Sequence, residues 1–176
     1  MLNDKQVMEL YVPIAEYPHI NFDASIKEAF SLLKKNFEEG KGYRSILVHD
    51  GQSRLKGLLS MRDMVRAVGP DFLKKTAPSY KGHQPYQGMK TEFPALSLIW
   101  QEGFPEKCKE EAKKPVKEVM TVIEDTVLLN DPIAKCVYLM IVHDIIVMPV
   151  VEDGKVVGVV RLVDLFKEIT DCVLED

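Results

Sequence analysis

The chain has 176 residues, of which 46% are apolar and 28% are charged, and its net charge is −4. This length and apolar content are enough for a buried core and exclude a chain that is disordered throughout. The acidic balance disfavours nucleic acid as a partner, and no apolar run approaches the roughly 20 residues that cross a membrane.

The first predicted helix covers residues 25–37. Ser25 and Glu28 have the spacing of a capping box, in which a serine and an acidic side chain satisfy each other's backbone N–H groups. Apolar residues then recur at helical spacing on one face, which predicts that this face packs on a core. Gly40 is placed to end the helix.

An apolar run at 46–48, a turn at Asp50-Gly51 and a second apolar run from Gly57 follow the helix. This pattern predicts two short strands. A short helix is expected at 61–68.

Residues 69–115 predict an insert rather than a simple linker. The segment holds six of the ten prolines, which disfavours long regular structure. It also holds several aromatic residues, so we expect it to pack on the rest of the chain or on a partner subunit. Helices are expected near 96–101 and 106–114.

The helix predicted at 131–142 begins with Asp131 as its cap and Pro132 in its first helical position. Its residues are apolar on nearly all sides, so we expect it to be buried on more than one side. Two β-branched runs, at 145–151 and 156–160, predict a hairpin closed by the Asp153-Gly154 turn, and a last helix is expected from residue 162.

The same order of elements therefore occurs twice. Gly57 and Asp63 are separated by the same interval as Gly158 and Asp164, and similar openings stand at 7–10 and 116–119. A repeat of roughly 60 residues buries too little surface alone, so the two repeats are expected to pack on each other. The predicted division is 1–68 for the first repeat, 69–115 for the insert and 116–176 for the second repeat.

This pattern resembles the cystathionine-β-synthase (CBS) domain, present here as a tandem pair. The residues that carry the resemblance are Val119-Met120-Thr121, Met148-Pro149-Val150-Val151, Gly158-Val159-Val160 with Asp164, and Gly57-Leu58-Leu59-Ser60 with Asp63. The resemblance implies an α/β (α+β) fold in which two helix-strand-strand-helix repeats are related by a pseudo-twofold axis.

The resemblance also implies two clefts that bind adenosyl compounds such as AMP, ADP or ATP. In the family, the Asp of a Ser/Thr-x-x-Asp motif holds the ribose hydroxyls. The residues expected in the first cleft are Ser60, Asp63, Thr121, Val122, Ile123, Val147 and Met148. Those expected in the second are Pro13, Ile14, Arg44, Ser45, Arg161 and Asp164.

The two clefts are not equivalent in sequence. Val147 takes the place where the family often has a phosphate-binding arginine, whereas Arg44 is assigned to that place in the second cleft. Arg161 replaces the Ser/Thr of the second ribose motif, where it either grips a phosphate or fills the cleft. We therefore expect the cleft of Ser60 and Asp63 to bind nucleotide more readily.

Structural explanations compete with these assignments. Ser60 and Asp63 also have the spacing of a helix cap, which needs no ligand. Arg44 precedes a predicted strand, where most arginines are simply exposed to solvent. Two functions remain open: a regulatory module that senses adenine nucleotides, and a constitutive assembly module whose working surface is the insert. Nucleotide-dependent thermal stabilisation separates them.

The sequence offers no enzyme motif, so neither a catalytic residue nor a required cofactor is expected. Three widely spaced cysteines without a Cys-x-x-Cys indicate reduced thiols and no metal site, and no signal peptide is visible, so a cytoplasmic protein is expected. Helix faces at 61–68 and 162–169 are expected to pack chains into a homodimer or a multiple of it. Any output must pass to another subunit or to an unidentified target protein.

Overall fold

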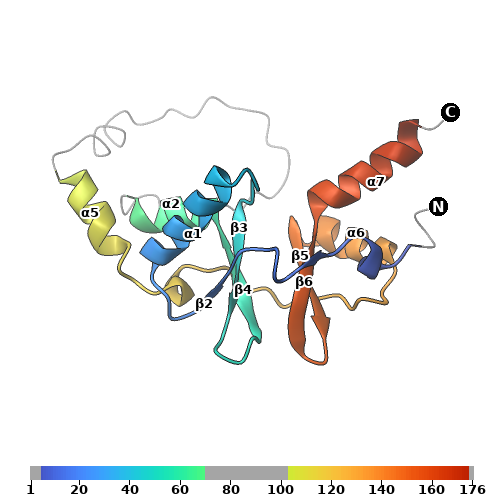
Figure 1. The fold of residues 1–176 in the computed structure, drawn as a ribbon, viewed down its shortest axis with the longest axis horizontal. Coiled ribbons are helices and arrows are strands. Elements are labelled where there is room, and N and C mark those ends of the chain that lie inside the picture. Colours follow the sequence, from blue (N-terminus) through green and yellow to red (C-terminus); the bar gives the residue numbers. More distant parts are fainter. Residues whose placement is uncertain (1–4, 70–102, 175–176) are drawn as a thin grey trace.

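The computed structural model describes residues 5–69 and 103–174 as a mixed α+β fold with two three-stranded sheets (Figure 1). The strands are β1 (Val12–Pro13), β2 (His19–Asn21), β3 (Ser45–His49), β4 (Leu55–Ser60), β5 (Val147–Glu152) and β6 (Lys155–Arg161). The α-helices are α1 (Ile26–Glu38), α2 (Met61–Val68), α5 (Phe104–Glu111), α6 (Ile133–Val142) and α7 (Leu162–Leu174). Two 3-10 turns, η2 (Val7–Glu9) and η4 (Val116–Glu118), complete the described elements.

The two repeats form two lobes with their sheets facing each other and their helices outside (Figure 1). One sheet has the order β2-β3-β4 and the other β1-β6-β5. Buried residues of both sheets meet in a shared cluster that includes Leu47 and Leu58 from one repeat and Val147 and Val159 from the other. This confirms the expected pair of packed repeats.

The first helix follows its sequence prediction. Ser25 caps α1, accepting a hydrogen bond from the backbone N–H of Glu28, and the Glu28 carboxylate accepts one from the backbone N–H of Ser25. Ile26, Ala29 and Leu33 are buried against the sheet. An amphipathic stretch with a capped start therefore forms the helix at the expected place.

The start of α6 differs from the prediction. Pro132, with ψ 141°, is the residue before the helix, so it does not occupy the first helical position. The carboxylate of Asp131 instead accepts hydrogen bonds from the backbone N–H of Leu128 and from the Lys135 ammonium. These two partners hold Asp131 outside the helix.

The burial of α6 was also predicted wrongly. Ile133, Cys136 and Met140 are fully buried, but Tyr138 and Ile141 on the other side are 64% and 67% exposed. One chain supplies a sheet for only one side of this helix. Its second apolar side remains on the surface.

The second hairpin confirms the predicted Asp153-Gly154 turn. Both residues have positive φ, 49° and 75°, as a two-residue turn between twisted strands requires.

The first hairpin has a longer connection, organised by the buried side chain of Asp50. Its carboxylate accepts hydrogen bonds from the backbone N–H groups of Gln52 and Arg54 and from the Arg54 guanidinium.

Each repeat receives part of its core from the opening segment of the other. Val7 is fully buried among residues of α6, β5 and β6, and Val116 is fully buried among residues of α1, β3 and β4. Backbone hydrogen bonds hold both segments, for example from Val7 N–H to the Asp131 carbonyl and from Val116 N–H to the Ala24 carbonyl. The two repeats are therefore interlocked rather than merely adjacent.

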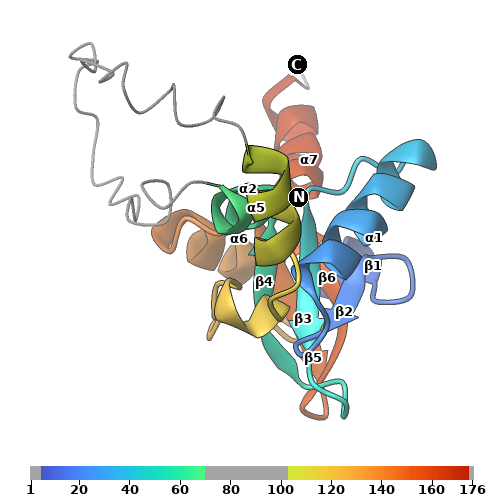
Figure 2. The same cartoon turned by 90° about the vertical axis from the view of Figure 1, so that its left-hand side faces the viewer.

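The described end of the predicted insert packs on the first repeat. Figure 2 shows α5 beside α2 on the outer side of that repeat, and the Cys108 thiol lies 3.3 Å from the Val68 carbonyl oxygen. The helix expected at 106–114 corresponds to α5, which begins and ends slightly earlier. The helix expected at 96–101 lies outside the described residues. No described helix is long and apolar enough to cross a membrane.

Candidate functional site

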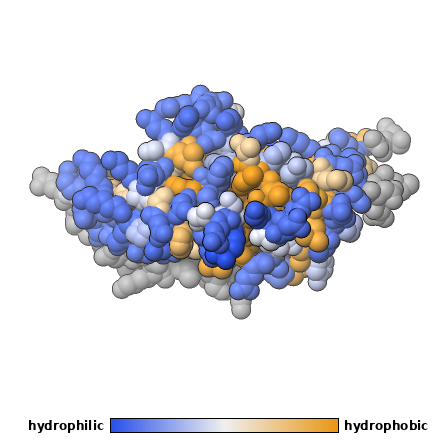
Figure 3. Space-filling model, turned by 60° about the horizontal axis from the view of Figure 1, so that its bottom comes forward, coloured by the Kyte–Doolittle hydropathy of each residue, from blue (hydrophilic) through white to orange (hydrophobic). Residues whose placement is uncertain are grey.

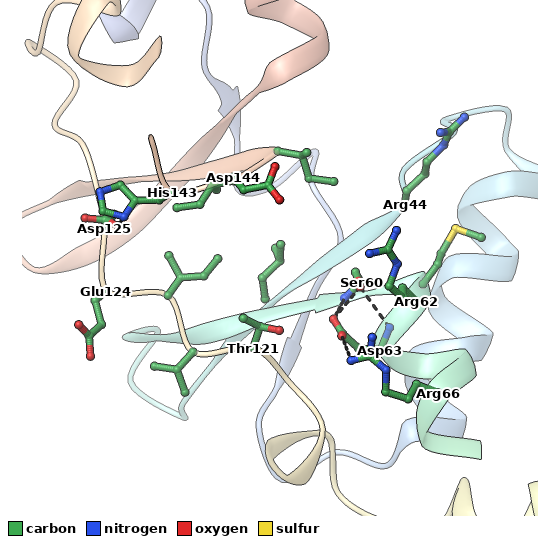
Figure 4. Close-up of a pocket in the computed structure, with 16 residues that line it drawn as sticks. Arg44, Ser60, Arg62, Asp63, Arg66, Thr121, Glu124, Asp125, His143 and Asp144 are labelled. Carbon is green, nitrogen blue, oxygen red and sulfur yellow. Dashed lines mark hydrogen bonds and ion pairs between the residues drawn. The ribbon is translucent and has the colours of Figure 1, made fainter. Parts of the chain in front are cut away.

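A cleft of about 830 Å³ opens between the two repeats (Figure 4). The first turn of α2 lies at one end, and the segments around residues 121–125 and 143–146 form the rest of the lining. The lining residues are Arg44, Leu58, Ser60, Met61, Arg62, Asp63, Arg66, Thr121, Val122, Ile123, Glu124, Asp125, His143, Asp144, Ile145 and Ile146.

Ser60 and Asp63 form a capping box at the start of α2. Asp63 Oδ2 accepts hydrogen bonds from the Ser60 hydroxyl (2.6 Å) and from the Ser60 backbone N–H (2.9 Å), while Ser60 Oγ accepts one from the Asp63 N–H. Asp63 Oδ1 has a looser contact, with the Arg66 guanidinium at 3.8 Å. The cap that the sequence allows is therefore present, and one carboxylate oxygen remains weakly engaged beside the cleft.

Charge is divided between the two ends of the cleft. Arg44, Arg62 and Arg66 belong to the end at α2. Figure 4 places Glu124, Asp125 and His143 at the opposite end, where His143 Nδ1 lies 3.6 Å from Asp125 Oδ2, and Asp144 between the two ends. An anionic group is therefore favoured at the α2 end, where the helix N-terminus adds its own positive potential.

The walls between these ends are apolar. Val122 and Ile146 are 65% and 51% exposed, although both are large hydrophobic residues, and Ile123 and Ile145 lie beside them. Figure 3 shows apolar residues gathered near the middle of one face, with hydrophilic residues on either side. Apolar walls with a few polar groups at one end suit a ligand with a flat ring and a polar, anionic tail.

Five of the seven residues predicted for the first cleft line this cleft: Ser60, Asp63, Thr121, Val122 and Ile123. Val147 and Met148 do not. Both are buried in β5, Val147 between the two sheets and Met148 beneath α6 and α7.

The residues just before β5 replace them. Ile145 and Ile146 precede the point at which the strand enters the core, so their side chains remain at the cleft. The sequence prediction was therefore wrong by one to two residues along the strand.

Arg44 lies in the first cleft, whereas the sequence assignment placed it in the second. The backbone explains this, because the Arg44 carbonyl accepts a hydrogen bond from the N–H of Met61 at the start of α2. The equivalent bond in the second repeat joins Leu162 N–H to the Ile146 carbonyl. Arg44 therefore corresponds to Ile146, and not to Val147 as the sequence comparison assumed.

The remaining predicted residues lie elsewhere. Pro13 pairs with Gly158 at the sheet edge, Ile14 lines a separate cavity of about 150 Å³, and Ser45 is buried. Arg161 and Asp164 are ion-paired with each other, and the hydrogen bond that the Arg161 guanidinium donates to the Asp164 carboxylate raises the pKa of that guanidinium.

Sequence reasoning missed Tyr17 and Tyr43. Their rings lie 4.9 Å apart, centroid to centroid, and Tyr43 lies under the Arg161 guanidinium. Tyr17 is 3% exposed, and burial raises the pKa of its phenol to about 12. Neither tyrosine belongs to a motif, so only the packing identifies them.

No group of three or more His, Cys, Asp or Glu side chains within residues 5–69 and 103–174 is arranged to hold a metal ion. The described part of the chain has three free cysteines, and Cys136 is buried in the core of the second repeat.

A profile of the CBS domain matches residues 7–70 and 116–171, which together make up more than half of the chain. The chain belongs to the CBS-domain family. Both matched stretches fall on the two lobes of the fold, so the protein is a CBS pair. No curated protein matches the chain.

Solved structures share the fold of this CBS pair. The CBS domains of a transcriptional regulator from Streptococcus pneumoniae are 19% identical, with a TM-score of 0.60, over 93% of this chain and 98% of that one. CBSX2 in complex with AMP is 18% identical, with a TM-score of 0.61, over 96% and 98%. The cytosolic domain of the Mg²⁺ channel MgtE in complex with ATP is 22% identical, with a TM-score of 0.58, over 90% of this chain and 46% of that one. At these identities the likeness shows the fold alone.

Proposed function

We propose that this CBS pair is a regulatory module that binds an adenine nucleotide (AMP, ADP or ATP) in the 830 Å³ cleft and signals by a change in conformation. The observation that carries the proposal is the Asp63 carboxylate, which lies at the cleft with one oxygen held by Ser60 and the other only loosely contacted. A carboxylate in this state accepts hydrogen bonds from the two hydroxyls of a ribose.

The rest of the cleft fits the other parts of a nucleotide. The start of α2 and the guanidinium groups of Arg44 and Arg62 favour the phosphates. The exposed apolar side chains of Val122 and Ile146 offer surfaces for a purine ring. Among proteins of the same fold, the complexes of CBSX2 with AMP and of MgtE with ATP support this ligand class.

We further propose that the module acts as a homodimer, or a multiple of it, through α6 and α7. Seven large apolar side chains of these helices are exposed by half or more: Tyr138, Ile141, Val142, Val163, Phe166, Val173 and Leu174. At roughly 100 Å² each they offer several hundred Å², close to the ~800 Å² that one partner contributes to a standard interface. A second copy of this chain offers the matching surface, since α6 is apolar on both sides. An unidentified target protein then reads the state of the dimer.

The test is thermal stability with and without nucleotide. AMP, ADP and ATP are added separately at millimolar concentration, and binding to the native state alone must raise the Tm. Asp63→Asn is expected to weaken binding of the best ligand roughly tenfold to a hundredfold, the value of a hydrogen bond to a charged group.

The matched control is Glu28→Gln. Glu28 occupies the same position in the capping box of α1 and lies outside the cleft, so the control removes a cap carboxylate without changing the site. Equal loss of nucleotide affinity in both variants would show that Asp63 acts only as a helix cap. If none of the three nucleotides raises the Tm of the natural protein, the proposed ligand class is wrong. In that case the constitutive assembly function replaces the regulatory one, and the exposed apolar face of α6 and α7 is the observation that favours it.

A further inference from the structure

Arg161 occupies in the second repeat the place that Ser60 occupies in the first. In the register of the hairpins, Ser45 is opposite Ser60 and Val147 is opposite Arg161. Asp164 therefore corresponds to Asp63, three residues further along in the first turn of the following helix. The side chains of both aspartates are 13% exposed, so a difference in their behaviour must come from their partners.

The partners differ sharply. Asp63 Oδ2 is held by Ser60, and Oδ1 has only the contact at 3.8 Å with Arg66. Asp164, in contrast, has both oxygens in one bidentate ion pair: Arg161 Nε donates to Oδ2 at 2.5 Å and Nη2 donates to Oδ1 at 2.7 Å. Paired charge-assisted hydrogen bonds of this geometry are among the strongest in proteins. The carboxylate that would receive ribose hydroxyls is already satisfied on both sides.

Aromatic side chains hold Arg161 in this position. The Arg161 guanidinium carbon lies 5.6 Å from the centroid of the Tyr43 ring, a distance at which a cation is attracted to the ring face. Tyr43 packs against Tyr17, and the Tyr17 hydroxyl lies 2.6 Å from Ser45 Oγ. The four residues form a continuous layer, which we name the Arg161 plug: Tyr17, Ser45, Tyr43 and Arg161.

The first cleft has no such layer. By the same register, Tyr43 corresponds to Ile145, which lines the open cleft. Tyr17 comes from a connection that is longer than its counterpart in the second repeat. Ile20 pairs with Val48 as Val127 pairs with Val150, so these two residues correspond. The first repeat has two more residues between its opening at Val7 and Ile20 than the second has between Val116 and Val127. This longer connection carries Tyr17, whose ring lies against that of Tyr43. Larger and additional side chains therefore fill the place that is open in the first cleft.

We propose that the Arg161 plug closes the second cleft from within, so that each chain binds a single nucleotide. The Arg161 guanidinium holds the Asp164 carboxylate in place of a ribose, and Tyr43 and Tyr17 occupy the place of a purine. This inference rests on the proposed function of the first cleft. It adds that only one of the two clefts related by the pseudo-twofold axis binds a nucleotide.

The test counts bound AMP by equilibrium dialysis and native mass spectrometry. The natural protein is expected to bind one AMP per chain and Asp63→Asn none at the same concentration. The double variant Arg161→Ser/Tyr43→Ile gives these two positions the side chains of their counterparts in the first cleft, so it is expected to bind two. In the Asp63→Asn background the double variant is expected to bind one. Two AMP per chain in the natural protein, or no gain in a folded double variant, would each overturn the plug.

The outcomes also separate the two proposals. If the natural protein binds no AMP, ADP or ATP, the proposed function fails, while the double variant still tests the plug. The plug is supported if the double variant, and not the natural protein, binds one AMP. It is overturned if the double variant also binds no AMP.

A second measurement is made on the natural protein. In the NMR spectrum of the natural protein, the Nε–H of Arg161, assigned by its loss in Arg161→Lys, is expected to be protected from exchange with water. It is also expected to keep its chemical shift when AMP is added. Rapid exchange, or a shift that saturates with AMP, would show that the guanidinium is open to ligand and would overturn the plug.

Discussion

Leu58 and Thr121 exchange two backbone hydrogen bonds, each 2.8 Å long, although they belong to different repeats. Through this pair the segment that leads into the second repeat is fixed to β4 of the first. Thr121 therefore reaches the cleft as an extension of the first sheet, next to Ser60 and Asp63. The geometry of the cleft depends on this junction as much as on the side chains that line it.

Gly57 precedes this junction and has no room for a side chain. A Cβ at Gly57 would overlap the Thr121 carbonyl oxygen, and a Cβ at Gly158 would overlap that of Val12. We expect Gly57→Ala and Gly158→Ala each to lower the free energy of unfolding by roughly 2–3 kcal/mol, because a backbone must move. Gly51→Ala is the control, since nothing lies within 4 Å of its Cβ position, and a change within about 0.5 kcal/mol is expected. Urea unfolding measures all three, and equal effects at Gly57 and Gly51 would contradict the overlap.

Val7 and Val116 test the interlocking of the repeats. Each is fully buried in the core of the opposite repeat, so Val7→Ala and Val116→Ala are each expected to cost about 2–3 kcal/mol. Because the cores are joined, either substitution should shift the unfolding of the whole protein in one transition, followed by circular dichroism. Val65→Ala on the exposed side of α2 serves as the control. Two separate transitions, only one of them shifted, would mean that the repeats unfold independently.

Asp50 is expected to make stability depend on acid pH. Burial of this carboxylate opposes ionisation, but hydrogen bonds from the Arg54 and Gln52 backbone and from the Arg54 and Lys56 side chains outweigh it and lower its pKa. A lowered pKa stabilises the folded state above the unfolded value, near pH 4, and this contribution is lost as the pH falls further. We expect Asp50→Ala to lower the Tm by at least about 2 °C at pH 7.

The difference between natural protein and Asp50→Ala should shrink as the pH is lowered from about 4. Asp23→Ala provides the comparison, because Asp23 forms a single exposed ion pair with Lys117. Thermal scans at pH 7, 4 and 3 measure both variants. A Tm difference for Asp50→Ala that stays constant over this range would rule out the ionised carboxylate as its source.

The dimer proposal predicts the effect of charge on the apolar face of α6 and α7. Ile141→Glu combined with Phe166→Glu places carboxylates where both side chains are more than 60% exposed. Since an interface core excludes unpaired charge, this double variant is expected to be monomeric at micromolar concentration by light scattering. Leu128→Glu, at an exposed loop position, is expected to leave the subunit number unchanged. A natural protein that is already monomeric would show that there is no dimer interface. A double variant that remains dimeric would show that the interface lies elsewhere.

Local sequence signals predicted most of the secondary structure. The capping box at Ser25, the amphipathic stretch after it and the Asp153-Gly154 turn act within a few residues, so the chain around them decides the outcome. The capping box at Ser60 is local in the same way, and its two residues are among the five predicted residues that line the cleft.

The missed features depend on packing between distant segments. A step of one residue along a strand turns a side chain to the other face, so the exact strand start decides whether Ile146 or Val147 meets the cleft. The contact of Tyr43 with Arg161 joins residues more than a hundred positions apart, and no local pattern records it.

The exchanged opening segments bear on how the protein is made. When residue 69 leaves the ribosome, the first repeat still lacks Val116, a fully buried member of its core. It obtains that residue only after the segment 103–116 has been synthesised, and until then the groove of α1, β3 and β4 stays uncovered. Val7, in contrast, meets its core partners of α6 and β5 only when those elements have been synthesised, and its core is complete only with β6 and α7. The core of the first repeat is therefore completed by a segment made after its own helices and strands, whereas the core of the second repeat includes a residue made before its own helices and strands.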